Sequence, residues 1–333
     1  MSIEIEQKSI YKANIDKSAF KEILKQQESY KEKFAKIKMH HIDTCILTIV
    51  IKNNEIKEIL QSHRGFFYPK RKENYIKLIS DTLNKYTIKD GIININIGDL
   101  PKEGMFNFCR EINKNFFLLP NFRFLNDDVI ISENKTFNNF EEQTVYLNEL
   151  SKYHDYNSKI NKVYFSGGVS KKVRQDFYDK CISNPEKYKG VLYCEEDDTK
   201  KMTQELKEYY VQNNILSNFF VPFKESLNYK YVLYLDSGHS ISDRMRLLLA
   251  TNSLVIKKNS DYEEFYYYLL KDKHNYYSFN NINELDNLYE ELENRIPIEQ
   301  QTQIIKNNNT FVKDILNYNN ILEYTANILN IVL

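Results

Sequence analysis

The sequence has no net charge, no long apolar run and no signal-peptide pattern. Lys plus Arg and Asp plus Glu each number 46 in 333 residues, whereas a protein that binds nucleic acid through bulk charge carries a basic excess. No stretch approaches the roughly 18 consecutive apolar residues of a membrane-spanning helix. The opening "MSIEIEQKSIYK" has acids among its first six residues. We therefore expect a cytoplasmic protein that does not bind nucleic acid.

Cysteine and glycine are also scarce. The four cysteines lie far apart and none belongs to a C-x-x-C pair: Cys45, Cys109, Cys181 and Cys194. This spacing favours reduced packing residues over disulfides or a zinc site. The eight glycines form neither a P-loop nor the G-x-G-x-x-G fingerprint of dinucleotide-binding enzymes. The missing fingerprint argues against a nucleotide-dependent enzyme such as an epimerase.

The chain does contain enough apolar residues for a sizeable core. Hydrophobic residues make up 42% of the 333 positions, and this length suits two domains better than one. Residues 1–44 mix Lys, Glu and Gln with spaced apolar positions, which predicts a helical N-terminal segment. A first domain over 45–145 opens with a predicted hairpin, "CILTIVIK", "NN" and "EIKEIL", and continues with the helix "ENYIKLISDTLNKY" and the strand "GIININIGDLP". A C-terminal helical segment is predicted over 301–333.

A second domain is predicted over 146–300. Its strand candidates are "KVYFSG", "GVLYC", "YKYVLYLD" and "NSLVIKK". Helix candidates alternate with them, near 171–182, 199–212, 242–251 and 281–294. Strands separated by helices predict a parallel sheet with right-handed crossovers, so we expect this half to be α/β and Rossmann-like.

The turn after "YKYVLYLD" combines small, hydroxyl and basic residues. It reads "SGHSISDRMRLL". Gly238 permits a close approach of the backbone, and His239, Ser240 and Ser242 can donate hydrogen bonds to an oxygen. Arg244 supplies positive charge. Taken alone, however, the stretch is more typical of an ordinary N-capped helix with solvated arginines.

A second turn of the same kind follows "KVYFSG". Ser166, Gly167 and Gly168 lie at the strand end, and the next helix candidate contains Arg174. Ligands of doubly wound sheets bind beyond the carboxyl ends of the strands, where loops and helix N-termini converge. Two strand-end turns of small residues, each followed by an arginine, therefore predict that a diphosphate binds between two loops of one sheet.

The third candidate, "INIGDLPKEG", belongs to the first domain. Asp99 ends the strand and precedes Leu100 and Pro101. An Asp before a Pro that starts a helix is a common N-cap arrangement, which is the simpler interpretation. The functional alternative is a carboxylate that accepts a proton from a substrate hydroxyl. The residues alone leave both interpretations open.

These stretches, in this order, resemble glycosyltransferase family 90, which includes protein O-glucosyltransferases, capsule xylosyltransferases and lipopolysaccharide-modifying enzymes. The most specific part is "YKYVLYLDSGHSISDRMRLLLATNSLVIKKNSDYEEFYYYLLKDKHNYY", and the resemblance runs from about residue 45 to 295. It implies an α/β protein of GT-B architecture, with two Rossmann-like domains facing a cleft. It also implies transfer of a sugar from a UDP donor with inversion.

The resemblance also implies roles for individual residues. Asp99 matches the catalytic base, and Arg244 and Ser242 match residues near the donor diphosphate. Glu264 in "EEFYY" matches an acidic residue near the nucleotide ribose. Arg174 matches the arginine of the helix that follows the first donor turn.

The chain departs from the family pattern in the first donor turn. Ser166 replaces an arginine and Gly168 stands where a Ser or Thr is usual, so less positive charge is expected at the diphosphate. Asp128 matches an aspartate near the acceptor cleft. Because the pair Asp127-Asp128 is not a D-x-D motif, no metal ion or other cofactor is expected.

We therefore expect an inverting glycosyltransferase that moves glucose or xylose from a UDP-sugar to a hydroxyl of a glycan, a lipid-linked glycan or a protein. The signal peptide, retention tail and paired cysteines of secretory members do not appear in the sequence. The expected location is the cytoplasm of a bacterium or of a virus-infected cell, where a membrane-bound acceptor would bring the protein to the membrane surface. The alternative is a catalytically weakened UDP-sugar-binding protein on the same fold.

Overall fold

The computed structural model describes residues 45–62, 68–114, 116–125, 131–132, 135, 137–169, 171–193, 202–217, 219, 221–237 and 240–333. The chain divides into two compact units. Unit 1 draws on Met1–Asn126, Asp261–Leu269 and Ile315–Leu333, and unit 2 on Asp127–Ser260 and Leu270–Asp314. The helical segment predicted over 1–44 lies outside the described residues, and the domain limits predicted after residues 145 and 300 stay predictions.

Unit 1 contains a mixed sheet, whose described strands lie in the order β2, β1, β3, β4, β6. Their bounds are β1 Ile46–Lys52, β2 Glu55–Gln61, β3 Gly91–Asn96, β4 Phe106–Asn107 and β6 Phe117–Leu118. β1 pairs antiparallel with β2 and β3, whereas β4 pairs parallel with β3 and β6. Asn53 and Asn54 have positive φ of 53° and 57°, as a two-residue type I′ turn requires. The predicted hairpin is confirmed.

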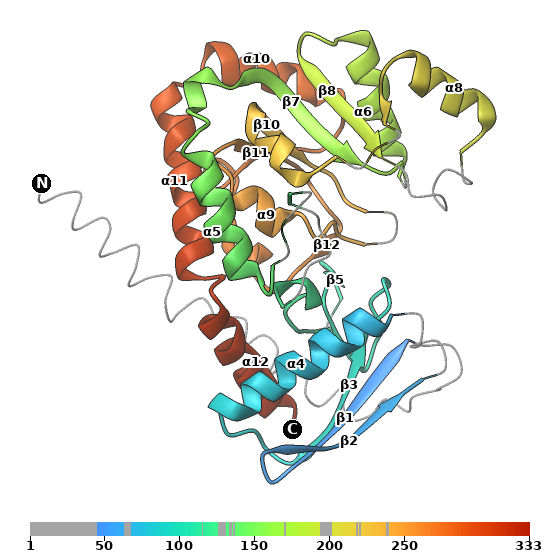
Figure 1. The fold of residues 1–333 in the computed structure, drawn as a ribbon, viewed down its shortest axis with the longest axis vertical. Coiled ribbons are helices and arrows are strands. Elements are labelled where there is room, and N and C mark those ends of the chain that lie inside the picture. Colours follow the sequence, from blue (N-terminus) through green and yellow to red (C-terminus); the bar gives the residue numbers. More distant parts are fainter. Residues whose placement is uncertain are drawn as a thin grey trace, which may run out of the picture. The chain divides into compact units, whose positions relative to one another are not determined.

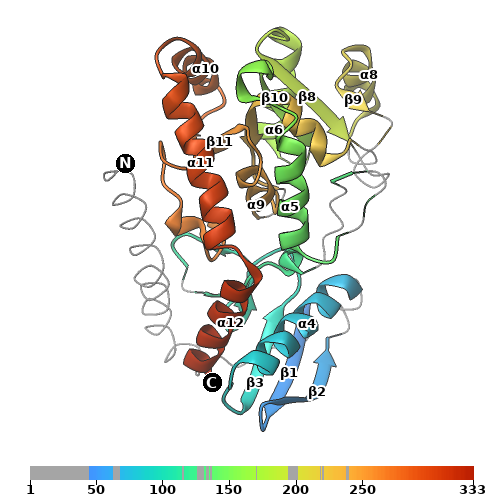
Figure 2. The same cartoon turned by 60° about the vertical axis from the view of Figure 1, so that its left-hand side comes forward.

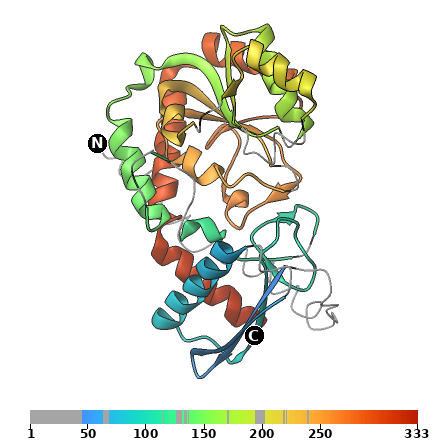
Figure 3. The same cartoon turned by 45° about the vertical axis from the view of Figure 1, so that its right-hand side comes forward.

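Two helices pack together on this sheet. They are α4 (Pro69–Lys85) and α12 (Tyr318–Val332), which lie side by side in Figures 2 and 3. α4 buries the apolar residues Tyr75, Leu78, Ile79 and Leu83, the spacing of one helix face. The helix predicted from "ENYIKLISDTLNKY" is therefore confirmed, and it begins a few residues earlier than its periodic part.

A pair of two-residue strands completes unit 1. β5 (Arg110–Glu111) and β12 (Tyr262–Glu263) pair antiparallel. Arg110 Nε and Glu263 Oε1 form an ion pair of 2.7 Å between largely buried side chains. Through this pairing the segment Asp261–Leu269 belongs to unit 1, although the residues on both sides of it belong to unit 2. Two short 3₁₀ helices, η4 (Phe122–Phe124) and η7 (Tyr267–Leu269), also lie in this unit.

Within the described part of unit 2, six strands form one parallel sheet in the order β13, β11, β10, β7, β8, β9. Figure 1 labels β7, β8, β10 and β11. The strands are β7 Ile160–Gly167, β8 Tyr188–Tyr193, β9 Leu216–Ser217, β10 Tyr229–Tyr234, β11 Leu254–Lys258 and β13 Tyr277–Phe279. The helices are α5 Phe140–Ser151, α6 Lys172–Ser183, α8 Gln204–Gln212, α9 Met245–Leu249, α10 Glu284–Asn294 and α11 Ile298–Asp314, with 3₁₀ helices η5 Tyr156–Ser158 and η6 Phe223–Asn228.

The sheet of unit 2 forms where the sequence predicts it. All four expected strands are present, and β9 and β13 extend the sheet at its two edges. The helices pack closely on it: a Cβ added at Gly190 in β8 would lie 2.6 Å from the ring of Tyr178 in α6. Gly190 thus lets α6 approach the strand. The predicted α/β class and parallel sheet are confirmed. No described helix has both the length and the apolar character that crossing a bilayer requires.

Candidate functional site

The first candidate site lies at the carboxyl ends of β7 and β10. These neighbouring strands occupy the middle of the parallel sheet. From β7 the chain continues to β8 and β9 on one side, and from β10 it continues to β11 and β13 on the other. The strand order therefore reverses between β7 and β10. Ligands of open α/β sheets bind at such a switch point, outside the carboxyl ends of the strands.

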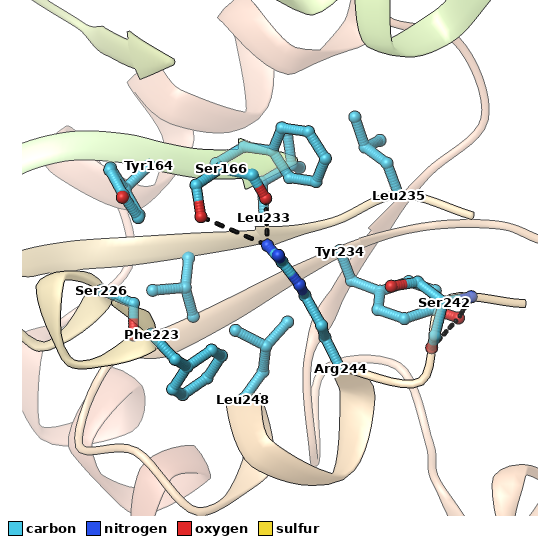
Figure 4. A pocket seen from close by; sticks show the side chains of 12 residues that line it. Tyr164, Ser166, Phe223, Ser226, Leu233, Tyr234, Leu235, Ser242, Arg244 and Leu248 are labelled. Atoms are coloured by element: carbon cyan, nitrogen blue, oxygen red, sulfur yellow. Dashed lines mark hydrogen bonds between the residues drawn. The ribbon is translucent and has the colours of Figure 1, made fainter. Parts of the chain in front are cut away.

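Arg244 connects the two strand ends at this point. It precedes α9, and its Nη1 donates to the carbonyl oxygen of Ser166 and, at 3.2 Å, to the Ser166 hydroxyl (Figure 4). Both predicted donor turns are thus brought together. The guanidinium thereby contacts both the main chain and the side chain of the residue at which the chain departs from the family pattern.

A small cavity lies beneath the Arg244 side chain. Its walls include Tyr164, Phe223, Leu233 and Leu248 (Figure 4). The cavity volume is about 20 Å³, which is room for about one water molecule. A sugar nucleotide does not fit in it.

Arg174 in α6 is buried and ties the same two strand ends together. Its Nη1 donates to the Gly168 carbonyl at 3.3 Å and its Nη2 to the Leu235 carbonyl at 3.1 Å. The guanidinium carbon lies 5.3 Å from the centre of the Phe165 ring, within cation–π range. Burial lowers the pKa of Arg174. These contacts hold the chain in place at the ends of both strands.

The residues of the second turn have buried and well-anchored backbones. Ser240 and Ser242 are both buried. The Tyr234 hydroxyl accepts from the Ser242 N–H and donates to the Ser242 carbonyl, both at 3.0 Å. Gly238 and His239 lie outside the described residues.

The capped-helix interpretation of this turn is wrong. The N-cap of α9 is Arg244, with no side-chain cap hydrogen bond, and the helix has only five residues. The arginines are not simply solvated either. Arg246 is fully buried, donates to the Asp243 carbonyl and lies 5.4 Å from the centre of the Phe140 ring.

Asp236 is a buried carboxylate for which no functional role was predicted from the sequence. It follows β10, and its side chain is 12% exposed. Oδ2 accepts from the Ser260 hydroxyl at 2.6 Å and lies 3.9 Å from Lys171 Nζ. Burial raises the pKa of Asp236 against the opposing effects of Ser260 and Lys171. The acidic end of the apolar strand "YVLYLD" was the available signal.

Asp99 belongs to unit 1, in the turn after β3. Two buried asparagines fix this turn. Asn96 Nδ2 donates to the Leu100 carbonyl at 2.6 Å, and Asn96 Oδ1 accepts from the Gly98 N–H at 3.0 Å. Asn107 Oδ1 accepts from the Lys102 N–H at 2.8 Å. No helix begins at Pro101, so the N-cap interpretation of Asp99 is wrong.

The Asp99 carboxylate is 47% exposed and forms an ion pair with Arg71, at 2.7 Å between Oδ1 and Nη2. Glu264 also belongs to unit 1 and is buried directly after β12. Its carbonyl accepts from the Tyr267 N–H at 3.1 Å. Asp128 lies outside the described residues. Among those that are described, no three His, Cys, Asp or Glu side chains gather where they could hold a metal ion.

Comparison with known protein families identifies the family of this protein. The model of glycosyl transferase family 90 matches residues 94–331, which is more than two thirds of the chain. The chain belongs to glycosyl transferase family 90. The match includes the turn of Asp99, both strand-end turns of unit 2 and Glu264. No curated protein is similar to this family member in sequence.

Several solved structures are distantly similar in fold. The C-terminal domain of the glycosyl transferase group 1 protein LpcC from Francisella tularensis has 13% identity and a TM-score of 0.33, over 57% of this chain and 97% of that one. Anabaena HepE in complex with UDP and glucose has 10% identity and a TM-score of 0.41, over 63% of this chain. HepE in complex with UDP-glucose has 11% identity and a TM-score of 0.40, over 64% of this chain. The matches span 55% and 56% of the HepE chains.

Proposed function

We propose that this family 90 protein is an inverting glycosyltransferase that uses a UDP-sugar. The observation that carries the proposal is the meeting of Arg244 and the Ser166 turn at the switch point of the parallel sheet. The amides of strand-end turns and a guanidinium group are suited to bind a diphosphate. The donor sugars proposed are glucose and xylose, as the family resemblance implies.

In the proposed reaction an acceptor hydroxyl attacks the anomeric carbon of the donor. Asp99 accepts the proton of this hydroxyl as the new C–O bond forms, because a neutral hydroxyl is a poor nucleophile. The bond between the anomeric carbon and the UDP oxygen breaks, and the electron pair leaves with UDP. Arg244 and the turn amides stabilise the charge that develops on the diphosphate. A single displacement inverts the anomeric configuration.

We propose that the reaction needs no metal ion. Arg244 brings its charge to the strand end at which the family arginine is replaced by Ser166. Side chains and amides that already point at the leaving group can stabilise it without a cation. The initial rate in excess EDTA should equal the rate with added magnesium or manganese. A large loss in EDTA that manganese restores would contradict this part of the proposal.

The second candidate is a UDP-sugar-binding protein with weakened catalysis. Two observations favour it: Ser166 has no charge, and the Arg244 guanidinium donates to protein oxygens of the same turn. In both cases we propose a cytoplasmic location. The acceptor would be a hydroxyl of a glycan, a protein or a lipid-linked glycan at the membrane surface.

A screen of UDP-sugars for thermal stabilisation, followed by a UDP-release assay, separates these proposals. UDP-glucose or UDP-xylose should raise the Tm, whereas uridine should not, because it lacks the diphosphate. The donor that stabilises should then release UDP with water as the acceptor. Stabilisation without UDP release would support the binding protein. No stabilisation by any UDP-sugar would contradict both candidates.

A further inference from the structure

The Arg71 side chain makes four contacts within unit 1. Its Nη1 donates to the Ile97 carbonyl at 2.9 Å, and its Nη2 pairs with Asp99 Oδ1 at 2.7 Å. The guanidinium carbon lies 4.3 Å from the centre of the Tyr68 ring and 4.7 Å from that of Phe122. Both distances are within cation–π range. The side chain is only 18% exposed, so the guanidinium is largely shielded from solvent.

The surroundings of Arg71 are themselves anchored. Asn74, one turn further along α4, is buried and donates from Nδ2 to the Phe122 carbonyl at 3.1 Å. The ring beneath the guanidinium is therefore fixed by the same helix that carries Arg71. Burial, and secondly the Asp99 carboxylate, raise the pKa of Tyr68. Tyr68 therefore keeps its proton and presents a neutral ring to the cation.

Helix stability does not account for an arginine at this position. Pro69 opens α4, and the first turn then carries Lys70 and Arg71 with no acidic residue. The first turn of a helix favours negative side chains, because the macrodipole is positive there. The arginine opposes this local preference, and it gains its contacts from the Asp99 turn instead.

The ion pair leaves one oxygen of Asp99 available. Arg71 contacts Oδ1, and no described residue donates a hydrogen bond to Oδ2. A half-exposed aspartate on a loop would otherwise sample several rotamers. Catalysis by a general base requires the acceptor atom to be held within reach of the proton, and small displacements are costly.

We infer that Arg71 is a positioning residue, which orients Asp99 so that Oδ2 faces the acceptor hydroxyl. The inference rests on the proposed function, in which Asp99 is the general base. A lysine cannot replace the arginine fully. Its single ammonium cannot donate to Ile97 and Asp99 in the fixed planar geometry of a guanidinium while it also stacks between two rings.

The test compares four variants in the full chain: Arg71→Met, Arg71→Lys, Asp99→Asn and the double variant Arg71→Met/Asp99→Asn. Lys77→Met is the control, because it breaks an ion pair with Asp81 (2.6 Å) on the same helix. The probe reaction is hydrolysis of UDP-glucose or UDP-xylose, with water as the acceptor. UDP affinity and Tm are measured for each variant.

Arg71→Met should lower kcat by on the order of 10²-fold while UDP affinity stays as in wild type. Arg71→Lys should restore only part of the loss, and Lys77→Met should behave as wild type. In the Asp99→Asn background, Arg71→Met should cause no further loss, because the two residues act as one unit.

The failure of each idea has its own signature. If Asp99→Asn retains wild-type kcat, the proposed base is wrong. If Asp99→Asn loses activity but Arg71→Met does not, or if the two losses multiply in the double variant, the positioning role of Arg71 is wrong and the base remains. If both Arg71 variants lower Tm and UDP affinity in step with kcat, Arg71 only supports the fold and the inference is overturned.

Discussion

One nitrogen of the Arg244 guanidinium donates to the protein, and its other nitrogens can donate to a ligand. Nη1 donates to Ser166, whereas no described residue accepts from Nε or Nη2. Two nitrogens that lie side by side can bind a phosphate with two parallel hydrogen bonds. This arrangement makes Arg244, and not the buried Arg174, the residue expected to contact the donor.

Arg244→Ala should therefore weaken the binding of UDP by roughly 2–5 kcal/mol if the ion pair is desolvated in the complex, and leave the binding of uridine unchanged. Isothermal titration with both ligands measures the difference. Lys172→Ala is the control, since Lys172 is exposed in the adjacent helix α6 and pairs with Asp176 at 2.8 Å. An equal loss for UDP and uridine would show that Arg244 supports the fold and does not contact the diphosphate.

Asp99 shows what local patterns can and cannot predict about a residue. The strand before it was correctly predicted from "GIININIGDLP", but β3 ends at Asn96, so Asp99 lies in the following turn and does not end the strand. The absence of a helix after Asp99 was not predicted. Asn96 and Asn107 hold the following residues in a turn. The partner Arg71 lies 28 residues earlier, and periodicity says nothing about contacts at that separation.

At the scale of elements, β10 and the turn behind it act together. The Tyr234 hydroxyl of β10 satisfies both the N–H and the carbonyl of Ser242. Buried backbone groups without partners are costly, so this one hydroxyl determines how well the turn is held. Arg244 follows two residues later, and its position depends on the same turn.

Tyr234→Phe should lower the free energy of unfolding by ~1–3 kcal/mol, because it leaves a buried N–H and carbonyl unpaired. It should also weaken UDP binding, since the turn amides are no longer fixed. Tyr153→Phe is the control, because Tyr153 is exposed. Urea denaturation and titration with UDP measure the two effects. Unchanged stability together with unchanged affinity would contradict this account of the turn.

The longer strands of unit 2 were predictable, whereas the two-residue strands of unit 1 were not. β7, β8, β10 and β11 contain apolar runs bounded by turns and separated by helix-length segments. β5 and β12 have two residues each and pair through residues about 150 positions apart, such as Arg110 and Glu263. No pattern of period two can appear in two residues. No sequence pattern therefore indicated that Asp261–Leu269 belongs to unit 1.

At the scale of the whole molecule, a buried lysine links stability to pH. Lys159 precedes β7 and donates to the Leu227 carbonyl and, at 2.9 Å, to the Ser253 hydroxyl. Burial lowers the pKa of Lys159 to about 7, and Asp155 opposes the shift. The unfolded chain keeps this lysine protonated up to about pH 10. Between these values the unfolded state binds more protons than the folded state.

The free energy of unfolding should therefore rise with pH from about 7 towards 10 through this residue, and the contribution should be constant below pH 7. Lys159→Met should flatten the curve over that window. Urea denaturation at a series of pH values measures it, with Lys152→Met as the control, since Lys152 is exposed directly after α5. The same slope in wild type and Lys159→Met would contradict the assignment.

The two units contribute different chemical groups to the proposed reaction. Unit 1 supplies a carboxylate with one oxygen held by Arg71, and unit 2 supplies a cationic turn at the switch point of a parallel sheet. In the proposed reaction Asp99 takes the proton of the acceptor hydroxyl and forms no bond to the sugar, so the displacement should occur in one step.

The anomeric configuration of the first product tests this claim most directly. The sugar in UDP-glucose and UDP-xylose is α-linked, and hydrolysis followed by proton NMR distinguishes the anomers before they equilibrate. Direct displacement by a water molecule that Asp99 deprotonates predicts that the β anomer of the free sugar appears first. Appearance of the α anomer first would contradict the single displacement, and with it the assignment of Asp99 as the base of an inverting transferase.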